Sequence, residues 1–377
     1  MKIAIITLPL HTNYGGIVQA YALRKVLQEL GHEVHVIDKL EKMPLPLWYK
    51  APFVYSLRAL KKAFSPSAKV EVFRELNFRK ELPVMATYTQ KFVDECVAPR
   101  MVRKYSDIRE GEYDAFIVGS DQVWRPRYFG KVEDAFLKFT SGWDVKRVSY
   151  AASFGTDQLE YEYELLQQCT DLLKEFDAVS VREDVAVGMC EEWFSREDAV
   201  QVADPVLLLT AEHYTGLAQQ ADEHSCKGKV ATYILDPSKE KQCVVDFAAK
   251  ITGKEVQPLY VDVRDRSLSL KDRVVPPVQQ WIAGFYDADF VVTDSFHGCV
   301  LSILLHKPFI AVGNSLRGMA RLQSLLNMFG LDGRLVQGID PEDDGEYWLD
   351  EPDWDAVDAI LATKREEAVA FLVNALK

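Results

Sequence analysis

The sequence lacks the long apolar runs, the paired cysteines and the excess of positive charge that mark several common classes of protein. No uninterrupted apolar stretch approaches the roughly 20 residues that a helix needs to cross a bilayer. The six cysteines are scattered without a C-x-x-C pair, so neither a zinc knuckle nor a disulfide framework is predicted. The formal net charge of -13 argues against general nucleic-acid binding, which needs a basic face.

Several catalytic signatures are also missing. There is no H-x-x-H or H-E-x-x-H spacing, so no metal site is expected. No G-x-S-x-G elbow is present, and we interpret Ser120 and Ser153 as hydrogen-bond donors rather than nucleophiles. The first glycine turn does not have the G-x-G-x-x-G spacing of a dinucleotide site. The opening residues predict a strand and a turn instead of a signal peptide, so we expect a cytoplasmic protein.

The sequence does contain a repeated alternation of short apolar strands with amphipathic helices. A chain of 377 residues that is 48% hydrophobic can bury large cores in more than one domain. The alternation predicts an α/β fold with parallel strands that are covered on both faces. We expect an N-terminal domain over residues 1–207, a second over 208–350, and a long amphipathic helix within 351–377.

In the first domain, several predicted strands end in polar or glycine-containing turns. Strands are expected at Lys2–Leu8, Glu33–Asp38, Ala115–Val118, Arg147–Ser153 and Ala178–Val181, with a helix at Ile17–Leu30 after the loop His11–Gly16. In parallel sheets the carboxyl ends of the strands share one edge, where ligands bind. Asp121, Ser153 and Arg182 are therefore expected along one rim of the sheet.

The stretch Phe290 to Val312 is the most informative part of the second domain. It predicts a buried strand, a break at Thr293–Ser295, an apolar helix from His297, and a second strand. Ser295 is a predicted N-cap, so the free N–H groups of the helix favour an anion beside His297. A histidine near a helix start is often only a hydrogen-bonded structural residue, and the residues alone leave both roles open.

Three arginines are candidates to lie near this histidine. Arg182 follows a strand, and Arg317 and Arg321 are one turn apart on a helix predicted from Leu316 to Phe329. Because arginine binds carboxylate and phosphate bidentately, the set suits a small ligand with both groups, such as phosphoenolpyruvate. The alternative is that Arg182 and Glu183 form a surface pair and that the other two arginines are solvated.

A basic segment interrupts the α/β alternation at about residues 43–100. From Lys50 to Lys80 the chain holds eight Lys and Arg against two Glu, within an acidic protein. We interpret this segment as a helical insertion. Either it contacts a membrane surface or an anionic lipid-linked substrate, or it presents solvated basic helix faces.

Six blocks in this order resemble the polysaccharide pyruvyl transferase family. They are N-Y-G-G-I-V-Q-A-Y-A-L (Asn13–Leu23), G-S-D-Q-V-W (Gly119–Trp124), S-Y-A-A-S-F-G (Ser149–Gly155), V-S-V-R-E (Val179–Glu183), D-P-V-L-L (Asp204–Leu208) and T-D-S-F-H-G (Thr293–Gly298). The resemblance implies two Rossmann-like domains facing across a cleft, as in GT-B glycosyltransferases, with the C-terminal helix returning to the first domain. It also implies transfer of the enolpyruvyl group of phosphoenolpyruvate onto two hydroxyls of a polysaccharide sugar.

By position in the resemblance, His297 falls on the family's motif histidine and Arg182 on its arginine. Family members commonly carry an arginine two positions before the histidine, whereas Ser295 and Phe296 precede His297 here. This departure leaves Arg317 or Arg321 to supply that charge.

We expect His297 to be the general acid/base, with Arg182 and Asp121 as further catalytic residues. The residues expected to contact substrate are Asn13, Tyr14, Gly15, Gly16, Gln19, Ser120, Ser153, Ser295, Asn314, Arg317 and Arg321. No cofactor beyond the donor is expected, and the acceptor is a glycan that a lipid carrier can hold at the inner membrane surface. Two alternatives stay open: a GT-B-type glycosyltransferase that uses a nucleotide sugar, and a non-catalytic carbohydrate-binding member.

Overall fold

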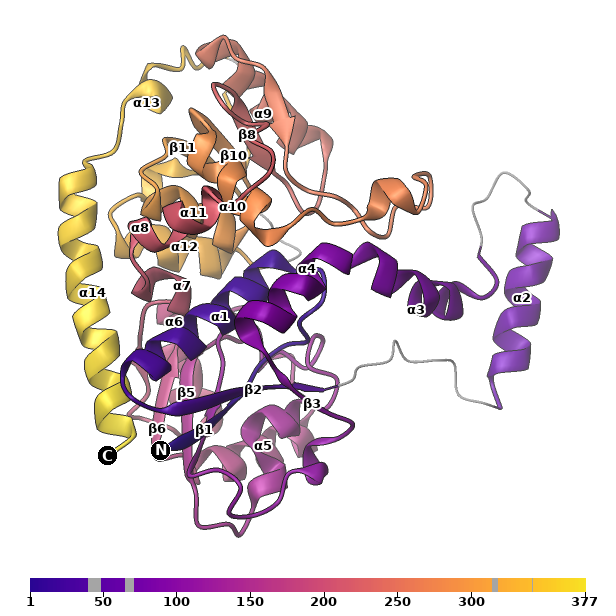
Figure 1. Cartoon of the computed structure of the whole chain (residues 1–377), viewed down its shortest axis with the longest axis vertical. Helices are drawn as coiled ribbons and strands as arrows, with labels where there is room; N and C mark the ends of the chain where they lie inside the picture. The colour runs from indigo at the N-terminus through magenta and orange to yellow at the C-terminus, as the bar shows by residue number, and fades with distance from the viewer. Residues whose placement is uncertain (40–48, 65–70, 314–317, 341) are drawn as a thin grey trace.

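The computed structural model describes residues 1–39, 49–64, 71–313, 318–340 and 342–377. These residues form two parallel sheets (Figure 1). The first sheet has the order β3-β2-β1-β4-β5-β6-β7, made of β1 (Lys2–Ile6), β2 (Glu33–Lys39), β3 (Arg100–Val102), β4 (Ala115–Val118), β5 (Lys146–Ala152), β6 (Ala178–Val181) and β7 (Val200–Gln201). The second has the order β12-β11-β10-β8-β9, made of β8 (Val230–Tyr233), β9 (Val256–Pro258), β10 (Phe290–Thr293), β11 (Phe309–Val312) and β12 (Leu335–Val336).

Helices connect the strands and cover both sheets. They are α1 (Tyr14–Glu29), α2 (Ala51–Phe64), α3 (Arg74–Met85), α4 (Thr87–Phe92), α5 (Tyr163–Leu173), α6 (Asp184–Phe194), α7 (Pro205–Leu208), α8 (Ala211–Ala218), α9 (Lys239–Thr252), α10 (Val278–Asp287), α11 (Phe296–Leu304), α12 (Met319–Met328), α13 (Glu346–Leu349) and α14 (Trp354–Ala375). Shorter turns are η1 (Val93–Val97), η2 (Tyr105–Asp107), η3 (Val132–Phe136), η4 (Lys138–Thr140), η5 (Lys271–Arg273) and η6 (Asp332–Arg334). None of the helices in these described ranges is long and apolar enough to cross a membrane.

The predicted α/β fold is confirmed, and the strands expected at Ala115–Val118, Ala178–Val181 and Phe309–Val312 have those bounds. The first and third of these strands are buried along their whole length, and β6 is buried except at the half-buried Ala178. Burial on both faces explains why their sequences are nearly continuous apolar runs. The expected loop up to Gly16 was wrong, because α1 already begins at Tyr14. Its first hydrogen bond runs from the amide of Ile17 to the carbonyl of Asn13, so both glycines lie in the first helical turn.

One apolar core joins the two sheets. It runs from Ile5 of β1, through Tyr14 and Leu207, to Trp281 of α10 and Val291 of β10, all of them buried. The rings of Tyr14 and Trp281 stack at 4.8 Å with 7° between their planes, and the Tyr14 hydroxyl donates to the carbonyl of Pro276 at 2.8 Å. Apolar burial across this interface therefore fixes how the two sheets face one another.

The last helix, α14, runs beside both sheets (Figure 1). Near its start the ring of Trp354 stacks on His306, with 4.9 Å between the centroids, and near its end the ring of Phe371 lies 6.3 Å from that of Tyr150. Between them, Arg365 donates to the carbonyl oxygens of Leu207 and Leu209 at 2.6 and 2.7 Å. The helix thus returns to the first sheet, as the family resemblance implied.

The residues after β2 form helices that leave the body of the protein. The short helix α4 lies near α1, α3 extends from it, and α2 stands beyond α3, away from both sheets (Figure 1). Glu81 of α3 forms ion pairs with Arg266 and Arg273, which belong to the chain between β9 and α10. Helix α3 is therefore attached to both halves of the molecule.

Arg365→Gln tests the anchoring of α14. Losing two charged hydrogen bonds to backbone carbonyls is expected to lower the free energy of unfolding by about 1–3 kcal/mol. Urea denaturation followed by circular dichroism measures the change. Lys364→Gln is the matched control, because Lys364 forms its ion pair with Glu367, one turn further along the same helix. Equal stability of both variants would contradict this role of Arg365.

Candidate active site

Polar side chains gather where the carboxyl ends of the two sheets meet. The strand order of the first sheet reverses between β1 and β4, and that of the second reverses between β8 and β10. Loops that follow strands on either side of such a reversal diverge and leave a crevice for ligands. The turns after β4, β5 and β6 supply Asp121, Ser153 and Arg182. The turn after β10 supplies His297 from the opposite sheet.

His297 lies in the first turn of α11 and is 7% exposed. The predicted cap is confirmed, because the Ser295 hydroxyl accepts a hydrogen bond from the amide of Gly298 at 3.4 Å. The imidazole ring rests on Gly15, where a Cβ atom would overlap it. Its Nε2 atom is buried and makes no hydrogen bond within the described chain, and it lies 3.7 Å from Oδ2 of Asp204.

Arg182 holds three carboxylates beside this histidine. Its guanidinium contacts Oε1 of Glu183 at 3.2 Å, Oδ2 of Asp204 at 3.0 Å and Oδ1 of Asp121 at 3.4 Å. It also lies over the ring of Phe296, 4.1 Å from the centroid. Burial alone would lower the pKa of Arg182, but the three carboxylates outweigh burial and raise it above its ordinary value. The alternative of an Arg182–Glu183 pair at the surface was wrong, since both residues are buried.

Asp204 connects the arginine with the histidine. It caps α7 by accepting from the amide of Val206 at 3.0 Å, and it accepts from the hydroxyl of Ser120 at 2.9 Å. Burial would raise the pKa of this carboxyl. His297, Arg182 and the Val206 amide outweigh burial and hold the pKa well below its ordinary value. Asp204 therefore stays ionised and faces Nε2 of His297.

Arg321 brings a further positive charge to the cluster from α12. It is 7% exposed, and burial, together with the nearby charge of Arg182, lowers its pKa to about 10. The hydroxyl of Ser324, one turn further along α12, accepts from the amide of Asp184 and the carboxamide of Gln201, each at 2.9 Å. These contacts fix α12 against the first sheet. The alternative that Arg321 is solvated was therefore wrong, because its side chain is buried.

Helix α12 is preceded by a backbone contact between the two halves. Gly318 has a φ angle of 94°, and a Cβ atom there would overlap the carbonyl oxygen of Gly155. The turn before α12 thus needs glycine both for its conformation and for its close approach to the loop after β5.

The structure brings most of the predicted site residues together, with different environments. Ser120 and Ser153 are buried, and they donate to Asp204 and Glu183 as the sequence predicted. Gln19 lies beneath the site, where its carboxamide bonds Thr7, the Gly16 carbonyl and the Ser120 amide.

Tyr14 belongs to the interface between the sheets, while Asn13 is exposed at the start of α1 beside Gly16. Asn314 and Arg317 lie outside the described residues. Asp204, Glu183 and Phe296 were not predicted as site residues. The Asp-Pro pair at 204–205 was the available signal for Asp204, because it is typical of a capped helix start.

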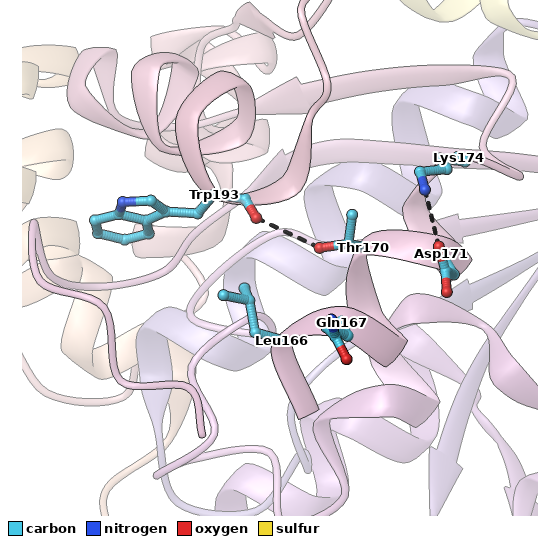
Figure 2. Close-up of a pocket in the computed structure, with 6 residues that line it drawn as sticks. All are labelled: Leu166, Gln167, Thr170, Asp171, Lys174 and Trp193. Carbon is cyan, nitrogen blue, oxygen red and sulfur yellow. Dashed lines mark hydrogen bonds and ion pairs between the residues drawn. The ribbon is translucent and has the colours of Figure 1, made fainter. Parts of the chain in front are cut away.

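Two hollows in the described surface lie apart from this cluster. One of about 400 Å³ is lined by Leu166, Gln167, Thr170, Asp171, Lys174 and Trp193 (Figure 2). Its charged groups, Asp171 and Lys174, pair with each other at 2.8 Å, as Figure 2 shows. The other, of about 310 Å³, lies between β8, β9 and α9. No group of three or more potential metal ligands occurs among the described residues.

The arrangement of two facing parallel α/β sheets with a buried His–Asp–Arg cluster between them defines the class: a GT-B-like protein. UDP-GlcNAc 2-epimerase of Neisseria meningitidis, in a structure bound to UDP-GlcNAc, has the same fold with a TM-score of 0.50 at 10% identity, over 99% of this chain and 100% of that one. UDP-N-acetylglucosamine 2-epimerase of Rickettsia bellii has a TM-score of 0.48 at 7% sequence identity, over 100% of this chain and 97% of that one. MurG of Acinetobacter baumannii has a TM-score of 0.41 at 11% sequence identity, over 99% of this chain and 98% of that one.

The polysaccharide pyruvyl transferase family matches residues 13–315. The chain belongs to this family and is a transferase. A comparison with curated proteins gives no significant match.

Gly15→Ala tests the packing of His297 on α1. The added methyl group is expected to push the imidazole away and to lower the free energy of unfolding by about 1–3 kcal/mol, the usual cost of overpacking. Gly216→Ala is the matched control, because no atom lies within 4 Å of a Cβ at that helical position. Thermal unfolding measures both variants. A Gly15→Ala protein as stable as the control would contradict the contact.

Asp204→Asn tests the buried network through its dependence on pH. A carboxyl whose pKa is depressed by folding stabilises the protein above its ordinary pKa of 3.8, and this contribution is lost as the pH falls through the folded value. At pH 7 the free energy of unfolding of the variant is expected to be about 3–5 kcal/mol lower than that of the wild type, because Arg182 loses a buried partner.

Urea denaturation from pH 7 to pH 3 measures the free energy of unfolding of Asp204→Asn and of the wild type. The difference between the two free energies should narrow as the pH falls below 3.8. Asp171→Asn, at an exposed surface pair, should follow the wild-type curve. A constant difference at all pH values would contradict the assignment.

Proposed function

We propose that the protein moves the enolpyruvyl group of phosphoenolpyruvate onto two hydroxyls of one sugar in a cell-surface polysaccharide or its lipid-linked precursor. The products are a cyclic pyruvate ketal and phosphate. Membership of the family supports this reaction class. The observation that carries the proposal is Nε2 of His297, which is buried, makes no hydrogen bond to described residues, and faces an ionised Asp204 beside two buried arginines.

The reaction needs a proton at carbon and a cationic site for phosphate. The oxygen of the first sugar hydroxyl bonds to C2 of phosphoenolpyruvate and gives its proton to a base, while C3 receives a proton from an acid. The oxygen of the second hydroxyl then bonds to C2 and loses its proton. The bond from C2 to the phosphate oxygen breaks, and phosphate leaves with the electron pair and takes up that proton. Protonation at carbon requires a positioned acid, and departure of phosphate is favoured by fixed positive charge.

His297 is the general acid in this proposal. The carboxylate of Asp204 lies 3.7 Å from its Nε2 atom, and the ring is held in place by its contact with Gly15. A histidine oriented by a buried carboxylate is a common arrangement for proton transfer near neutral pH. Asp121 is assigned to the acceptor, where it orients or deprotonates a sugar hydroxyl.

We assign the two arginines different tasks. Arg182 is a positioning residue, because its guanidinium already contacts Glu183, Asp204 and Asp121. Arg321 is assigned to the carboxylate or phosphate of the donor, in place of the arginine that family members carry before the histidine. Its lowered pKa still leaves it charged at neutral pH. The other residues proposed to border the site and contact substrate are Asn13, Ser295, Asn314 and Arg317.

We place the reaction in the cytoplasm, at the inner face of the membrane where lipid-linked glycans are assembled. The six cysteines support a reducing compartment, since all of them are free thiols. The acceptor sugar is selected by loops around the site, which bind hydroxyl groups of a given geometry.

Incubating the protein with phosphoenolpyruvate and lipid-linked glycans of the host tests the proposal, with phosphate release and a pyruvyl mass gain as readouts. His297→Ala is expected to lower the rate by about 10²–10⁴-fold, because general acid catalysis is lost. His224→Gln is the control, since His224 is exposed and pairs with Asp287 on the second domain.

Undiminished turnover by His297→Ala would contradict the assigned role. Thermal stabilisation by uridine diphosphate and not by phosphoenolpyruvate would favour a glycosyltransferase that uses a nucleotide sugar. Binding of glycan without turnover of either donor would favour a carbohydrate-binding protein.

A further inference from the structure

Helix α2 carries a row of large apolar side chains that the described protein leaves uncovered. Phe53, Leu57, Leu60 and Phe64 are 70%, 58%, 54% and 84% exposed. Their spacings of four, three and four residues place them in one narrow stripe along the helix. No residue of α2 is buried. Exposed apolar patches of this kind are typical of surfaces that bind a partner or a membrane.

The opposite face of α2 is occupied, so the stripe has a defined orientation. The ring of Tyr55 lies 5.0 Å from that of Phe73, just before α3. Arg58 forms a double hydrogen bond with Glu75 of α3, with both distances 2.8 Å. These contacts fix the helix on α3 and turn Phe53, Leu57, Leu60 and Phe64 away from it.

The charged side chains that α2 itself carries are all positive. The sequence from residue 44 to residue 70 contains no Asp or Glu, although the whole protein has a net charge of -13. Lys50 and Lys61 are exposed beside the stripe, whereas the exposed Lys62 lies one turn after Arg58 on the opposite face. A lysine at the edge of an apolar face can keep its stem on that face and its ammonium group in water, among anionic headgroups.

We propose that α2 is an interfacial helix that docks the protein on an anionic lipid bilayer. The four apolar side chains insert at the boundary of headgroups and acyl chains, and Lys50 and Lys61 bind the anionic headgroups. A second copy of this chain fits the surface less well, because two α2 helices would bring like charges together. The docking itself does not depend on the proposed reaction. If that reaction is correct, docking brings the crevice to a lipid-linked acceptor.

The position of α2 in the molecule suits this role. The helix stands beyond α3, away from both sheets (Figure 1). Helix α3 is in turn tied to the second half of the chain, because Glu81 pairs with Arg266 and Arg273. A membrane bound to α2 would therefore hold the rest of the protein, with its candidate active site, in a fixed orientation.

Co-sedimentation of the full-length protein with lipid vesicles tests the proposal. Vesicles that contain phosphatidylglycerol are expected to retain the protein at low salt, whereas pure phosphatidylcholine vesicles should retain far less. Each lysine near an anionic surface contributes a factor of roughly five, so replacing Lys50 and Lys61 with Gln should weaken partitioning about 25-fold. Gln at the exposed Lys104 and Lys131 is the charge-matched control.

A second pair of variants tests the apolar stripe. Leu57→Glu with Leu60→Glu is expected to weaken partitioning about tenfold or more, because two charges would enter the apolar boundary. The control, Leu349→Glu with Val373→Glu, makes the same change at residues that are 49% and 39% exposed elsewhere. Unchanged circular dichroism and thermal midpoint confirm that each variant folds.

Three results would overturn the proposal. The first is that wild-type protein is not retained by anionic vesicles, and the second is that the control variants lose as much binding as the α2 variants. The third is that light scattering shows a dimer that Leu57→Glu with Leu60→Glu converts to a monomer, while vesicle binding is absent. That last result would assign the stripe to a second copy of the chain.

Discussion

The buried contact between Asp204 and Arg182 is the interaction on which the rest of the site depends. A guanidinium that is 3% exposed is stable only when carboxylates compensate its charge, and three of them do so here. Those carboxylates come from the turn after β4, the start of α6 and the cap of α7. The need to neutralise one arginine therefore fixes three loops of the first sheet. Asp204 then faces His297, and so the second sheet is coupled to the first.

Close backbone approach is the second constraint, and it explains why the halves meet where they do. The imidazole of His297 can rest on α1 only because residue 15 is glycine, and the turn before α12 can meet the loop after β5 only because residue 318 is glycine. Apolar packing of Tyr14 on Trp281 closes the same interface. The interface between the two halves is thus held by contacts that any larger side chain would disturb.

The sequence was sufficient to predict the features that depend on local pattern. Apolar strands alternating with helices gave the α/β fold, and the polar turns after three strands correctly predicted that Asp121, Ser153 and Arg182 meet. It was not sufficient for features that depend on packing between distant segments. Asp204 is far from His297 in the chain, and only the closed structure brings their side chains together. For the same reason, the sequence could not show that Gln19 supports the site from below and does not border it.

The central claim is that a proton is delivered to C3 of phosphoenolpyruvate while the pyruvyl group is transferred to a sugar. Running the reaction with phosphoenolpyruvate and a glycan acceptor in fully exchanged D₂O measures this step directly. The account predicts a ketal whose methyl group carries one deuterium, by mass spectrometry and NMR, with one phosphate released per ketal. A ketal with an undeuterated methyl group, or consumption of a nucleotide sugar without any ketal, would contradict it.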